Sequence, residues 1–310
     1  MGWFNAMCTS VARLDGKTAV ITGCNTGIGK VTVQDFFERG ARVIMACRNR
    51  EKATQAAEEI KQATASKSNL GEIIVEELDL MSLKSVRSCA EKILAREKRI
   101  DLLINNAGVM TCPYGKTEDG FEIQFGTNHL GHFLLTLLLL PRICQSTPAR
   151  IVNVSSVAHE RGTINFDDLN WSQTPYSAIK AYGQSKLANV LFTKELHRKL
   201  REKNIKDVNV YSLHPGVIKT ELARHVADTY GKGVKLLMSA MRWFFKTPLQ
   251  GAQTTIYCAV DEKCASESGL YYAECAVKEP SQAAQNEADA KRLWSESLKL
   301  VGLPENYEPF

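Results

Sequence analysis

Short runs rich in apolar and β-branched residues alternate with longer stretches of helical pattern along most of this chain. Strands that alternate with helices in this way form a parallel sheet with both faces covered, and right-handed crossovers make the sheet doubly wound. The expected strands are 18–22, 41–46, 72–78, 101–105, 150–155, 208–213 and 269–272, and the expected helices are 27–38, 51–64, 82–96, 122–144, one that begins just past Pro175 and runs towards Leu200, and one near Pro248.

The alternation also bears on the number of domains. A chain of 310 residues could form one large domain or two small ones. Because no linker interrupts the alternation, we predict a single α/β domain over residues 1–310, with a doubly wound parallel sheet of about seven strands. Residues 217–247 interrupt the alternation of strands and helices as a long insertion. A long segment at the substrate-binding end of a doubly wound sheet is usually a lid over the substrate.

The inserted segment has one apolar helical face that fits more than one role. Methionine repacks easily, so the face suits a lipophilic substrate, but it could equally cap the core. A third alternative is contact with a bilayer surface, because basic residues flank the apolar ones. The apolar positions are Val234, Leu237, Met238, Met241 and Phe245, and the basic ones are Lys232, Lys235, Arg242 and Lys246.

The composition argues against several classes of function. The net charge of +5 is mild and the basic residues are scattered, so we expect no nucleic-acid partner. The nine cysteines are odd in number and include no C-x-x-C pair, which favours free thiols in a reducing compartment, and no metal cluster is evident.

The sequence suggests a cytoplasmic protein, or one bound peripherally to the cytosolic face of a membrane. No run approaches the roughly 20 apolar residues of a membrane span, and the N-terminus lacks the regions of a signal peptide. Trp3, Phe4, Met7 and Val11 could form one apolar helical face. We expect this face to pack against the domain, with peripheral membrane contact as the alternative.

A glycine-rich string, Thr22-Gly-Cys-Asn-Thr-Gly-Ile-Gly29, lies where the first expected strand meets the first helix. Glycines at 23, 27 and 29 let the backbone turn tightly and approach a pyrophosphate at the helix N-terminus, as in Rossmann-like dinucleotide sites. We therefore predict that the residues of this loop bind a dinucleotide; they are Gly23, Asn25, Thr26, Gly27, Ile28 and Gly29.

The end of the second expected strand bears on which dinucleotide binds. An acid there would bind the adenosine ribose 2′-hydroxyl, whereas an arginine accommodates a 2′-phosphate. The sequence reads Cys47-Arg48-Asn49-Arg50, with no acid before Glu51. Arg48 therefore favours NADP(H). Asp79, after the third strand, could accept a hydrogen bond from the adenine amino group or could cap the next helix.

Two tyrosine–lysine pairs share the same spacing, Tyr176 with Lys180 and Tyr182 with Lys186. Residues four apart lie on one helical face, and a nearby ammonium favours the phenolate and lowers the phenol pKa. On a single helix the two pairs would lie roughly 120° apart, so only one could face a given site. Spacing alone leaves both pairs open.

Several motifs together resemble the short-chain dehydrogenase/reductase family over about residues 15–302. They are the glycine-rich string, Asn105-Asn-Ala-Gly108, Asn128, Ser155-Ser156, Tyr182-x-x-x-Lys186 and Pro215-Gly216. Longer strings, such as Asn128-His-Leu-Gly-His-Phe133 and Ser185-Lys-Leu-Ala-Asn-Val-Leu-Phe-Thr193, look like the NADP(H)-preferring retinol dehydrogenase branch. The family pattern continues from its tyrosine as Y-x-x-S-K-L-A-N, which only Tyr182 matches.

The resemblance implies a role for each matched residue. Tyr182 would exchange a proton with the substrate oxygen, Ser156 would hydrogen-bond that oxygen, and Lys186 would lower the phenol pKa and bind the nicotinamide ribose. Asn128 would hold a water that links Lys186 to solvent. The further cofactor contacts would be Asn106, Ala107, Gly108, Pro215, Gly216 and Thr220.

The implied activity is NADP(H)-dependent interconversion of a lipophilic aldehyde or ketone and its alcohol. Retinal and retinol are the first pair, and farnesal or steroid carbonyls are alternatives. A catalytically silent redox-sensing scaffold that binds the dinucleotide is the rival from another class. Small residues beside Tyr182 could let a second subunit approach, as in a homodimer, but the spacing does not decide this.

Overall fold

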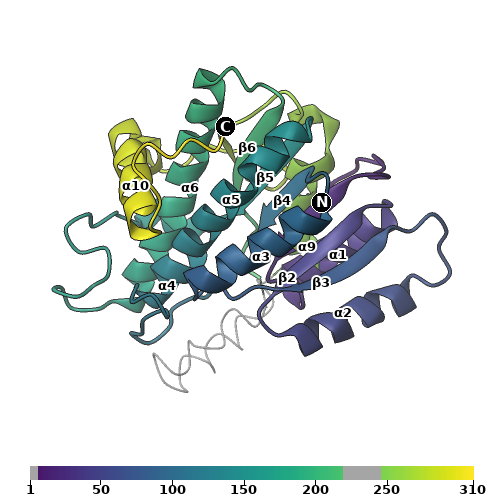
Figure 1. Cartoon of the computed structure of the whole chain (residues 1–310), viewed down its shortest axis with the longest axis horizontal. Coiled ribbons are helices and arrows are strands. Elements are labelled where there is room, and N and C mark those ends of the chain that lie inside the picture. The colour runs from purple at the N-terminus through teal and green to yellow at the C-terminus, as the bar shows by residue number, and fades with distance from the viewer. Residues whose placement is uncertain (1–5, 219–245) are drawn as a thin grey trace.

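The computed structural model describes residues 6–218 and 246–310, which surround one eight-stranded sheet (Figure 1). The strand order is β3-β2-β1-β4-β5-β6-β7-β8; β1 to β7 run parallel and β8 pairs antiparallel with β7. The predicted doubly wound α/β fold is therefore confirmed. The strands are β1 (Thr18–Thr22), β2 (Arg42–Cys47), β3 (Glu72–Glu77), β4 (Leu102–Asn105), β5 (Ala149–Val154), β6 (Val208–His214), β7 (Leu270–Ala273) and β8 (Ala276–Val277).

All seven predicted strands lie within one residue of their expected limits. A short run made almost entirely of apolar residues is typical of a strand that is buried on both faces of a sheet. Strand β1 illustrates this, because all five of its residues are buried. The sequence missed β8, because a two-residue strand at the edge of a sheet is too short to leave a hydrophobic pattern.

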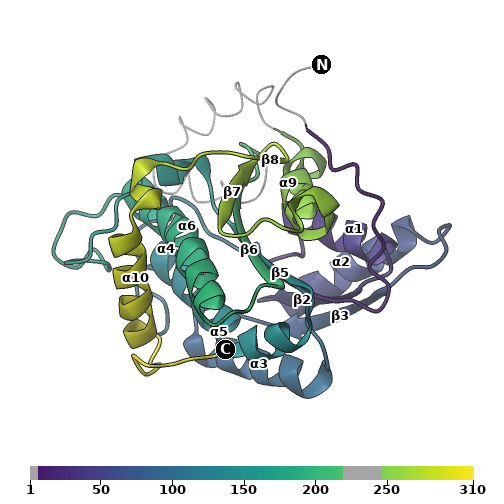
Figure 2. The ribbon, with the colours of Figure 1, turned by 90° about the horizontal axis from the view of Figure 1, so that it is seen from above.

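Helices cover both faces of the sheet (Figure 2). One hydrophobic cluster lies under α3, α5, α6 and α10, and a second lies under α1, α2 and α9. The α-helices are α1 (Gly27–Glu38), α2 (Arg50–Ala63), α3 (Leu83–Arg96), α4 (Ile123–Phe125), α5 (Gly131–Gln145), α6 (Ala178–Glu202), α9 (Pro248–Val260) and α10 (Glu287–Leu300); the shorter elements are a π-helix, η1 (Gly126–Leu130), and the 3₁₀-helices η2 (Val157–Arg161), η5 (Glu262–Cys264) and η6 (Gln282–Gln285).

Side chains cap several helices where the sequence predicts them to begin. The side chain of Asn49 accepts the backbone N–H of Lys52 at 2.7 Å, and Ser82 accepts that of Ser85 at 3.4 Å. Thr247 and Gln250 form a reciprocal capping box at the start of α9, where Pro248 occupies the first turn. Such caps satisfy N–H groups that have no partner within the helix.

The predicted helix 122–144 is interrupted by a π-turn. Glu122 caps the start of the helix, because its carboxylate accepts the N–H groups of Gln124 and Phe125. The helix then passes from α4 into the wider π-helix η1 and continues as α5. Hydrophobic periodicity does not distinguish a π-turn from an α-helix over one turn, so no sequence pattern indicates it. Single π-turns within helices often occur at functional sites.

The N-terminal arm does not form the helix that the apolar spacing suggested. Residues 6–14 have no regular secondary structure, and Val11 is 91% exposed. The arm is held by hydrogen bonds instead: Cys8 N–H donates to Gln253 Oε1 at 3.1 Å, and the Arg39 guanidinium donates to the carbonyls of Ser10 and Ala12. The predicted helical face is therefore wrong over these residues, and Trp3 and Phe4 lie outside the described part of the chain.

Most of the predicted lid also lies outside the described residues. The segment 217–247 is described only at its ends, where Lys246 N–H donates to Val217 O at 2.8 Å. Within the described ranges, no helix is both long and apolar enough to cross a membrane.

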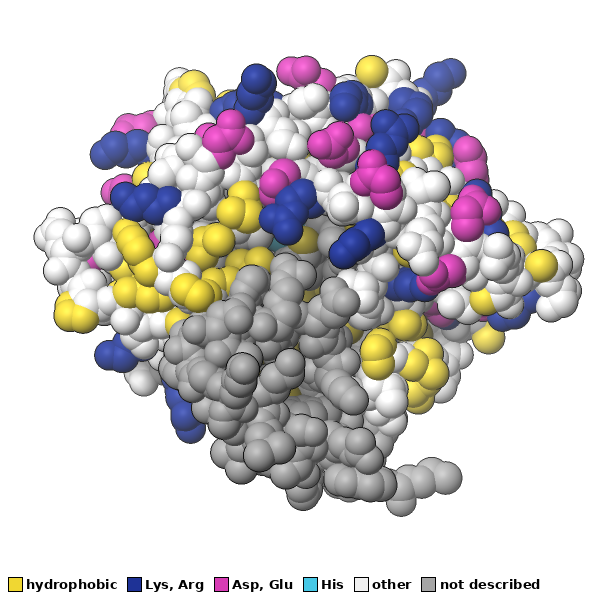
Figure 3. Space-filling view, turned by 90° about the horizontal axis from the view of Figure 1, so that it is seen from below, with side chains coloured by type: hydrophobic (Ala, Val, Ile, Leu, Met, Phe, Trp, Pro, Cys, Tyr) yellow, Lys and Arg dark blue, Asp and Glu magenta, His cyan; other side chains and the backbone are white. Residues whose placement is uncertain are grey.

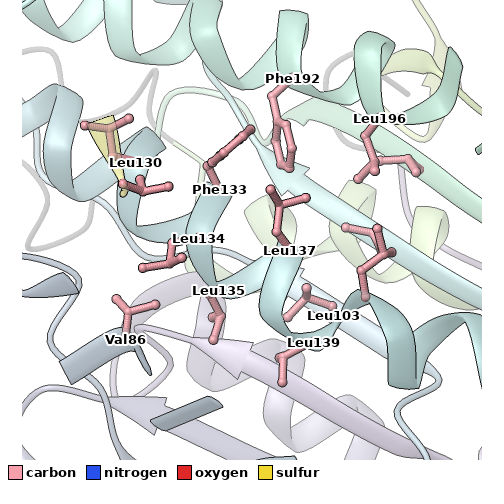
Figure 4. Close-up of a cluster of buried hydrophobic side chains, with 14 of the residues drawn as sticks. Val86, Leu103, Leu130, Phe133, Leu134, Leu135, Leu137, Leu139, Phe192 and Leu196 are labelled. Carbon is pink, nitrogen blue, oxygen red and sulfur yellow. The ribbon is translucent and has the colours of Figure 1, made fainter. Parts of the chain in front are cut away.

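Phe133 of α5 lies at the centre of the cluster under α5, α6 and α10 (Figure 4). Its ring packs against Phe192 and Trp294, with centroids 5.2 Å away in both cases. Phe133→Ala should lower the free energy of unfolding by about 3–5 kcal/mol, because it removes buried contacts and leaves a cavity. Urea denaturation measures this, with exposed Val11→Ala as the control. A loss no larger than that of the control would show that the core collapses around the missing ring.

Candidate active site

The glycine-rich loop is shaped by close approach to the loop that follows β4. Gly23 has a φ of +59°, and a Cβ atom there would lie 2.6 Å from the Cβ of Ala107. A Cβ at Gly29 would lie 2.6 Å from Asn106 Nδ2. These positions therefore accept only glycine without a backbone shift, which explains the glycine spacing in the sequence.

A pocket of about 270 Å³ lies between this loop and the carboxyl ends of β2, β3 and β4. No side chain caps the N-terminus of α1 at Thr26, so the helix presents its backbone N–H groups to this pocket. Eleven of the predicted cofactor residues line it: Gly23, Asn25, Thr26, Gly27, Ile28, Gly29, Arg48, Asp79, Asn106, Ala107 and Gly108. The glycine cradle and the exposed N–H groups fit a dinucleotide diphosphate.

Arg48, Lys52 and Asp79 form the polar wall of this pocket. Arg48 is exposed, and its Nη1 lies 3.4 Å from Met81 Sδ. The Asp79 carboxylate accepts the N–H of Met81 at 2.9 Å, whereas α3 is capped by Ser82. The alternative role of Asp79 as the helix cap is therefore wrong, and its side chain belongs to the pocket.

The sequence reasoning missed several residues of the pocket. Lys52 and Asn49 lie one helical turn or less beyond Arg48, and the polar run after β2 was the signal that could have identified them. The remaining lining residues, which present apolar or backbone surface that no motif marks, are Ala46, Leu78, Leu80, Met81, Val109 and Thr127.

Thr22 ties the glycine loop to the loop after β4. Its hydroxyl accepts the backbone N–H groups of Asn106 and Ala107, each at 3.0 Å, and lies 2.8 Å from His132 Nε2. The other ring nitrogen of His132, Nδ1, lies 3.0 Å from the backbone oxygen of Asn128. That carbonyl can only accept, so Nδ1 carries the proton and Nε2 accepts from Thr22. The sequence assigned no role to His132.

Asn128 lies in η1, and its amide is fully engaged within the chain. Oδ1 accepts the N–H of Val109 at 2.8 Å, while Nδ2 donates to Val109 O and to Ser185 Oγ, both at 2.9 Å. A Cβ at Gly108 would lie 3.2 Å from Asn128 Oδ1 and 3.5 Å from Lys186 Nζ. Asn128 thus fixes the loop beside Lys186, and the predicted water relay stays a prediction.

Tyr182, Lys186 and Ser156 come together at the carboxyl end of β5. The Ser156 side chain lies near enough to the Tyr182 hydroxyl to lower its pKa, and Lys186 Nζ lies 5.7 Å from the centre of the Tyr182 ring. Ser155 is excluded from this role because its hydroxyl donates to the backbone oxygen of Lys186 at 2.7 Å. The choice of the second serine, made from the family pattern, therefore has a geometric basis.

Burial dominates the pKa values of this pair. It raises the pKa of Tyr182 to about 12, and only the hydrogen bond with Ser156 lowers that pKa. Burial also lowers the pKa of Lys186 to about 8. The Lys186 ammonium donates to the backbone oxygen of Val154 at 3.1 Å. The expected lowering of the phenol pKa by Lys186 is therefore not found in this arrangement.

Tyr176 has a different environment from Tyr182. The helix α6 begins at Ala178, so Tyr176 precedes it, and Lys180 is exposed. The Tyr176 hydroxyl accepts from Gln124 Nε2 at 2.9 Å and lies 3.0 Å from the carboxylate of Glu122. Burial and Glu122 both raise its pKa. The two tyrosine–lysine spacings are therefore not equivalent, and only the second lies on a helix.

The small residues beside Tyr182 are used inside the chain. A Cβ at Gly183 would lie 3.2 Å from Ala158 O, and one at Gly162 would lie 2.4 Å from Gly183 O. This contact brings the loop that bears Ser156 onto α6. Since these small residues are buried, a homodimer would have to use another face.

The remaining predicted cofactor contacts follow β6. Gly216 has a φ of +97°, which explains a glycine after Pro215. Thr220 lies outside the described residues. The described residues contain no cluster of three groups that could bind a metal ion, and all nine cysteines are free thiols.

Comparisons with known proteins agree with this arrangement. The family model for short chain dehydrogenases matches residues 17–231. The chain is 49% identical to human retinol dehydrogenase 13, over 96% of this chain and 88% of that protein, and 48% identical to human retinol dehydrogenase 11, over 97% and 90%.

Two solved structures are also similar. An uncharacterised protein from Mycobacterium paratuberculosis is similar with a TM-score of 0.77 and 37% sequence identity. The match covers 99% of this chain and 100% of that protein's chain. The RhlG/NADP active-site complex of Pseudomonas aeruginosa is similar with a TM-score of 0.62 and 25% sequence identity. The match covers 84% of this chain and 94% of that protein's chain.

The Thr22 hydroxyl can be tested with a matched pair of variants. Thr22→Val keeps the shape of the side chain but removes the acceptor of the Ala107 N–H, at a cost of about 1–3 kcal/mol. The Asn106 N–H loses one of its two acceptors and keeps the backbone oxygen of Ile104 at 3.0 Å. Thr22→Ser keeps the hydroxyl and should be much milder. Chemical denaturation measures both. Equal losses in the two variants would show that the methyl group, rather than the hydrogen bonds, matters at this position.

Proposed function

Because this chain belongs to the short-chain dehydrogenase family, a family of NAD(P)-dependent oxidoreductases, we propose that it interconverts a lipophilic aldehyde or ketone and its alcohol with NADP(H). The first substrate pair is retinal and retinol. The observation that carries the proposal is the grouping of Ser156 and Tyr182 next to Lys186, at the edge of the sheet where the dinucleotide pocket opens.

The protein's part in the reaction is to bind, orient and move a proton. A bound nicotinamide supplies the hydride in reduction and accepts it in oxidation. The Tyr182 hydroxyl would give its proton to the carbonyl oxygen in reduction and remove one from the alcohol in oxidation. The Ser156 hydroxyl would donate to the same oxygen and stabilise its developing negative charge.

Lys186 and Asn128 would support this proton transfer. A phenol with a pKa raised to about 12 holds its proton firmly, so it is a ready acid only when the site stabilises the phenolate. A protonated Lys186 near the ring would do this once its ammonium is drawn towards the nicotinamide ribose. Asn128 would hold the 108–109 loop so that Lys186 can reach both partners.

The preference for NADP(H) rests on the charges after β2. Arg48 and Lys52 line the pocket, while Glu51 does not. Two cations next to the adenosine ribose would favour a 2′-phosphate. The similar structure from Pseudomonas aeruginosa also supports this assignment. That protein is 25% identical to this chain, has the same fold and is a complex with NADP.

The preference for a lipophilic substrate rests on apolar surface and on the relatives. Val157 follows Ser156 and is 39% exposed, and Ile179 precedes Tyr182 by about one helical turn and is 59% exposed. Hydrophobic side chains also gather on the lower face of the molecule (Figure 3). The curated relatives are named as retinol dehydrogenases. Farnesal and steroid carbonyls remain the alternative substrates.

The proposal extends to location and partners. We propose a cytoplasmic enzyme, or one bound peripherally to the cytosolic face of a membrane, with a lid over the substrate at 217–247. A homodimer is proposed through a face other than the small residues of α6. A silent redox-sensing scaffold would bind the same dinucleotide without turnover, so NADPH oxidation with a carbonyl substrate distinguishes the two.

The two tyrosines allow a sharp test of the catalytic assignment. Tyr182→Phe should abolish oxidation of NADPH with retinal but leave NADPH binding largely intact, because only the transferred proton is lost. Tyr176→Phe should be mild, since its hydroxyl is hydrogen-bonded within the chain. Absorbance of NADPH measures turnover, and fluorescence titration measures binding. Reversed results would move the site to Tyr176, and binding without turnover of any retinoid, isoprenoid or steroid carbonyl would favour the scaffold.

Arg48→Asp tests the cofactor preference. The ratio of kcat/KM for NADPH over NADH should fall by about 10- to 100-fold, because hydrogen bonds to charged groups contribute about 1.5–3 kcal/mol. Arg50→Asp is the matched control, with the same charge change two residues away and outside the pocket lining. An unchanged ratio in Arg48→Asp would show that Arg48 is only a surface residue.

A further inference from the structure

We propose that His159 and His214 are positioning residues that hold Ser156 against Tyr182 by opposite hydrogen-bonding roles. His214 would accept backbone N–H groups on one side of the Ser156 loop, and His159 would donate to the Ser156 carbonyl on the other. This inference rests on the proposed role of Ser156. No sequence motif assigns a role to either histidine.

His214 joins two loops of the site through one ring atom. Its Nδ1 accepts the backbone N–H of Val157 at 3.2 Å and that of Gly216 at 3.4 Å. His214 is the last residue of β6, which lies beside β5 in the sheet. The ring therefore connects the residue after Ser156 with the Pro215–Gly216 turn, where the cofactor is proposed to bind.

His159 holds the other side of Ser156. Its Nδ1 lies 2.7 Å from the backbone oxygen of Ser156, and its Nε2 accepts the N–H of Ser281 at 3.2 Å. The ring is fully buried and packs on Tyr271 at a centroid distance of 4.7 Å. His159 thus anchors the Ser156 loop to the segment that precedes η6.

These contacts determine the tautomer of each ring. A backbone carbonyl can only accept, so His159 carries its proton on Nδ1; backbone N–H groups can only donate, so His214 carries its proton on Nε2. A second proton on either ring would place N–H against N–H. Both histidines must therefore be neutral for the arrangement to hold.

Apart from the packing of Gly162 on Gly183 and the bond from Ser155 Oγ to Lys186 O, few contacts fix the backbone of Ser156. β5 ends at Val154, and the last strand-like bond is from Ser155 N–H to Leu213 O at 2.7 Å. Beyond it, Ser156 O also accepts the N–H of His159, and Ser156 Oγ accepts that of Ala158 at 3.2 Å. These two bonds lie within one short turn and do not connect Ser156 to other elements. Among the described residues, His214 connects the Ser156 loop to β6, and His159 connects it to the segment that precedes η6.

The electrostatic environment keeps both rings neutral near neutral pH. Burial, together with Lys278, Lys246 and His159, lowers the pKa of His214 to about 4, although Glu160 raises it. Burial also lowers the pKa of His159, against the Ser156 carbonyl and Glu160, which raise it. Each folded-state pKa lies below the unfolded value of about 6.5. The stability that the neutral rings contribute is therefore present above that value and is lost as the pH falls towards the folded-state pKa.

Matched variants of the full-length chain test the proposal. His214→Leu removes the acceptor, whereas His214→Asn offers a side-chain oxygen near the position of Nδ1. His159→Leu removes the donor, whereas His159→Asn offers an amide N–H in its place. His197→Leu is the control, because His197 Nδ1 lies 2.9 Å from Ser268 Oγ and makes no contact with the Ser156 loop.

The expected result is a loss of kcat that the asparagine variants partly restore. Each leucine variant should lower kcat with retinal and NADPH by about 10- to 100-fold, because small misplacements of a catalytic group cost that much. In a Ser156→Ala background the same changes should have almost no further effect, since they act through Ser156. His197→Leu should leave kcat unchanged at equal amounts of folded protein.

A second measurement does not need turnover. The ¹³C chemical shift of the Tyr182 Cζ atom, assigned with Tyr182→Phe, reports the hydrogen bond between Tyr182 and Ser156 near neutral pH. It should move in both leucine variants and return towards the parent value in the asparagine variants. If the parent does not turn over retinal, the proposed function fails, while this shift still tests the histidines. An unmoved shift, or equal kcat losses with and without Ser156, would overturn the proposal.

Discussion

The arrangement of the site depends on the hydrogen bonds of the Thr22 hydroxyl. At the buried end of β1 it accepts two backbone N–H groups from the loop after β4 and donates to His132, which in turn donates to the carbonyl of Asn128. One oxygen therefore joins the glycine loop, the loop beside Lys186 and the π-turn. In the low dielectric of the interior such a network is strong when complete and costly when one member is missing.

A second constraint is the burial of the reacting groups. Tyr182 and Lys186 are both almost fully buried, and burial alone moves their pKa values in opposite directions, up for the phenol and down for the ammonium. Each shift disfavours the charged form that proton transfer needs. Groups with such perturbed pKa values gather at functional sites, because a bound ligand can then change their ionisation by a small change of contacts.

Much of the fold could be predicted because buried parallel strands leave a simple pattern. Every expected strand is found within one residue, and the glycines at 23 and 29 are explained by contacts under 3 Å that a side chain would make. The π-turn, the irregular N-terminal arm and the two-residue β8 could not be predicted. Each depends on hydrogen bonds from residues distant in the chain or on a strand too short to show periodicity.

The sequence by itself determined the α/β fold, the position of the dinucleotide loop and the identity of a small set of reactive side chains, because local periodicity and glycine spacing encode them. The family pattern already favoured Tyr182 over Tyr176, but only the tertiary structure gave the physical reason for that choice. Tyr176 precedes the helix and is bonded to Gln124, whereas Tyr182 meets Ser156 across the site. It also gave the histidines their tautomers. Both results depend on which atoms from distant strands meet, and such contacts leave no local pattern in a sequence.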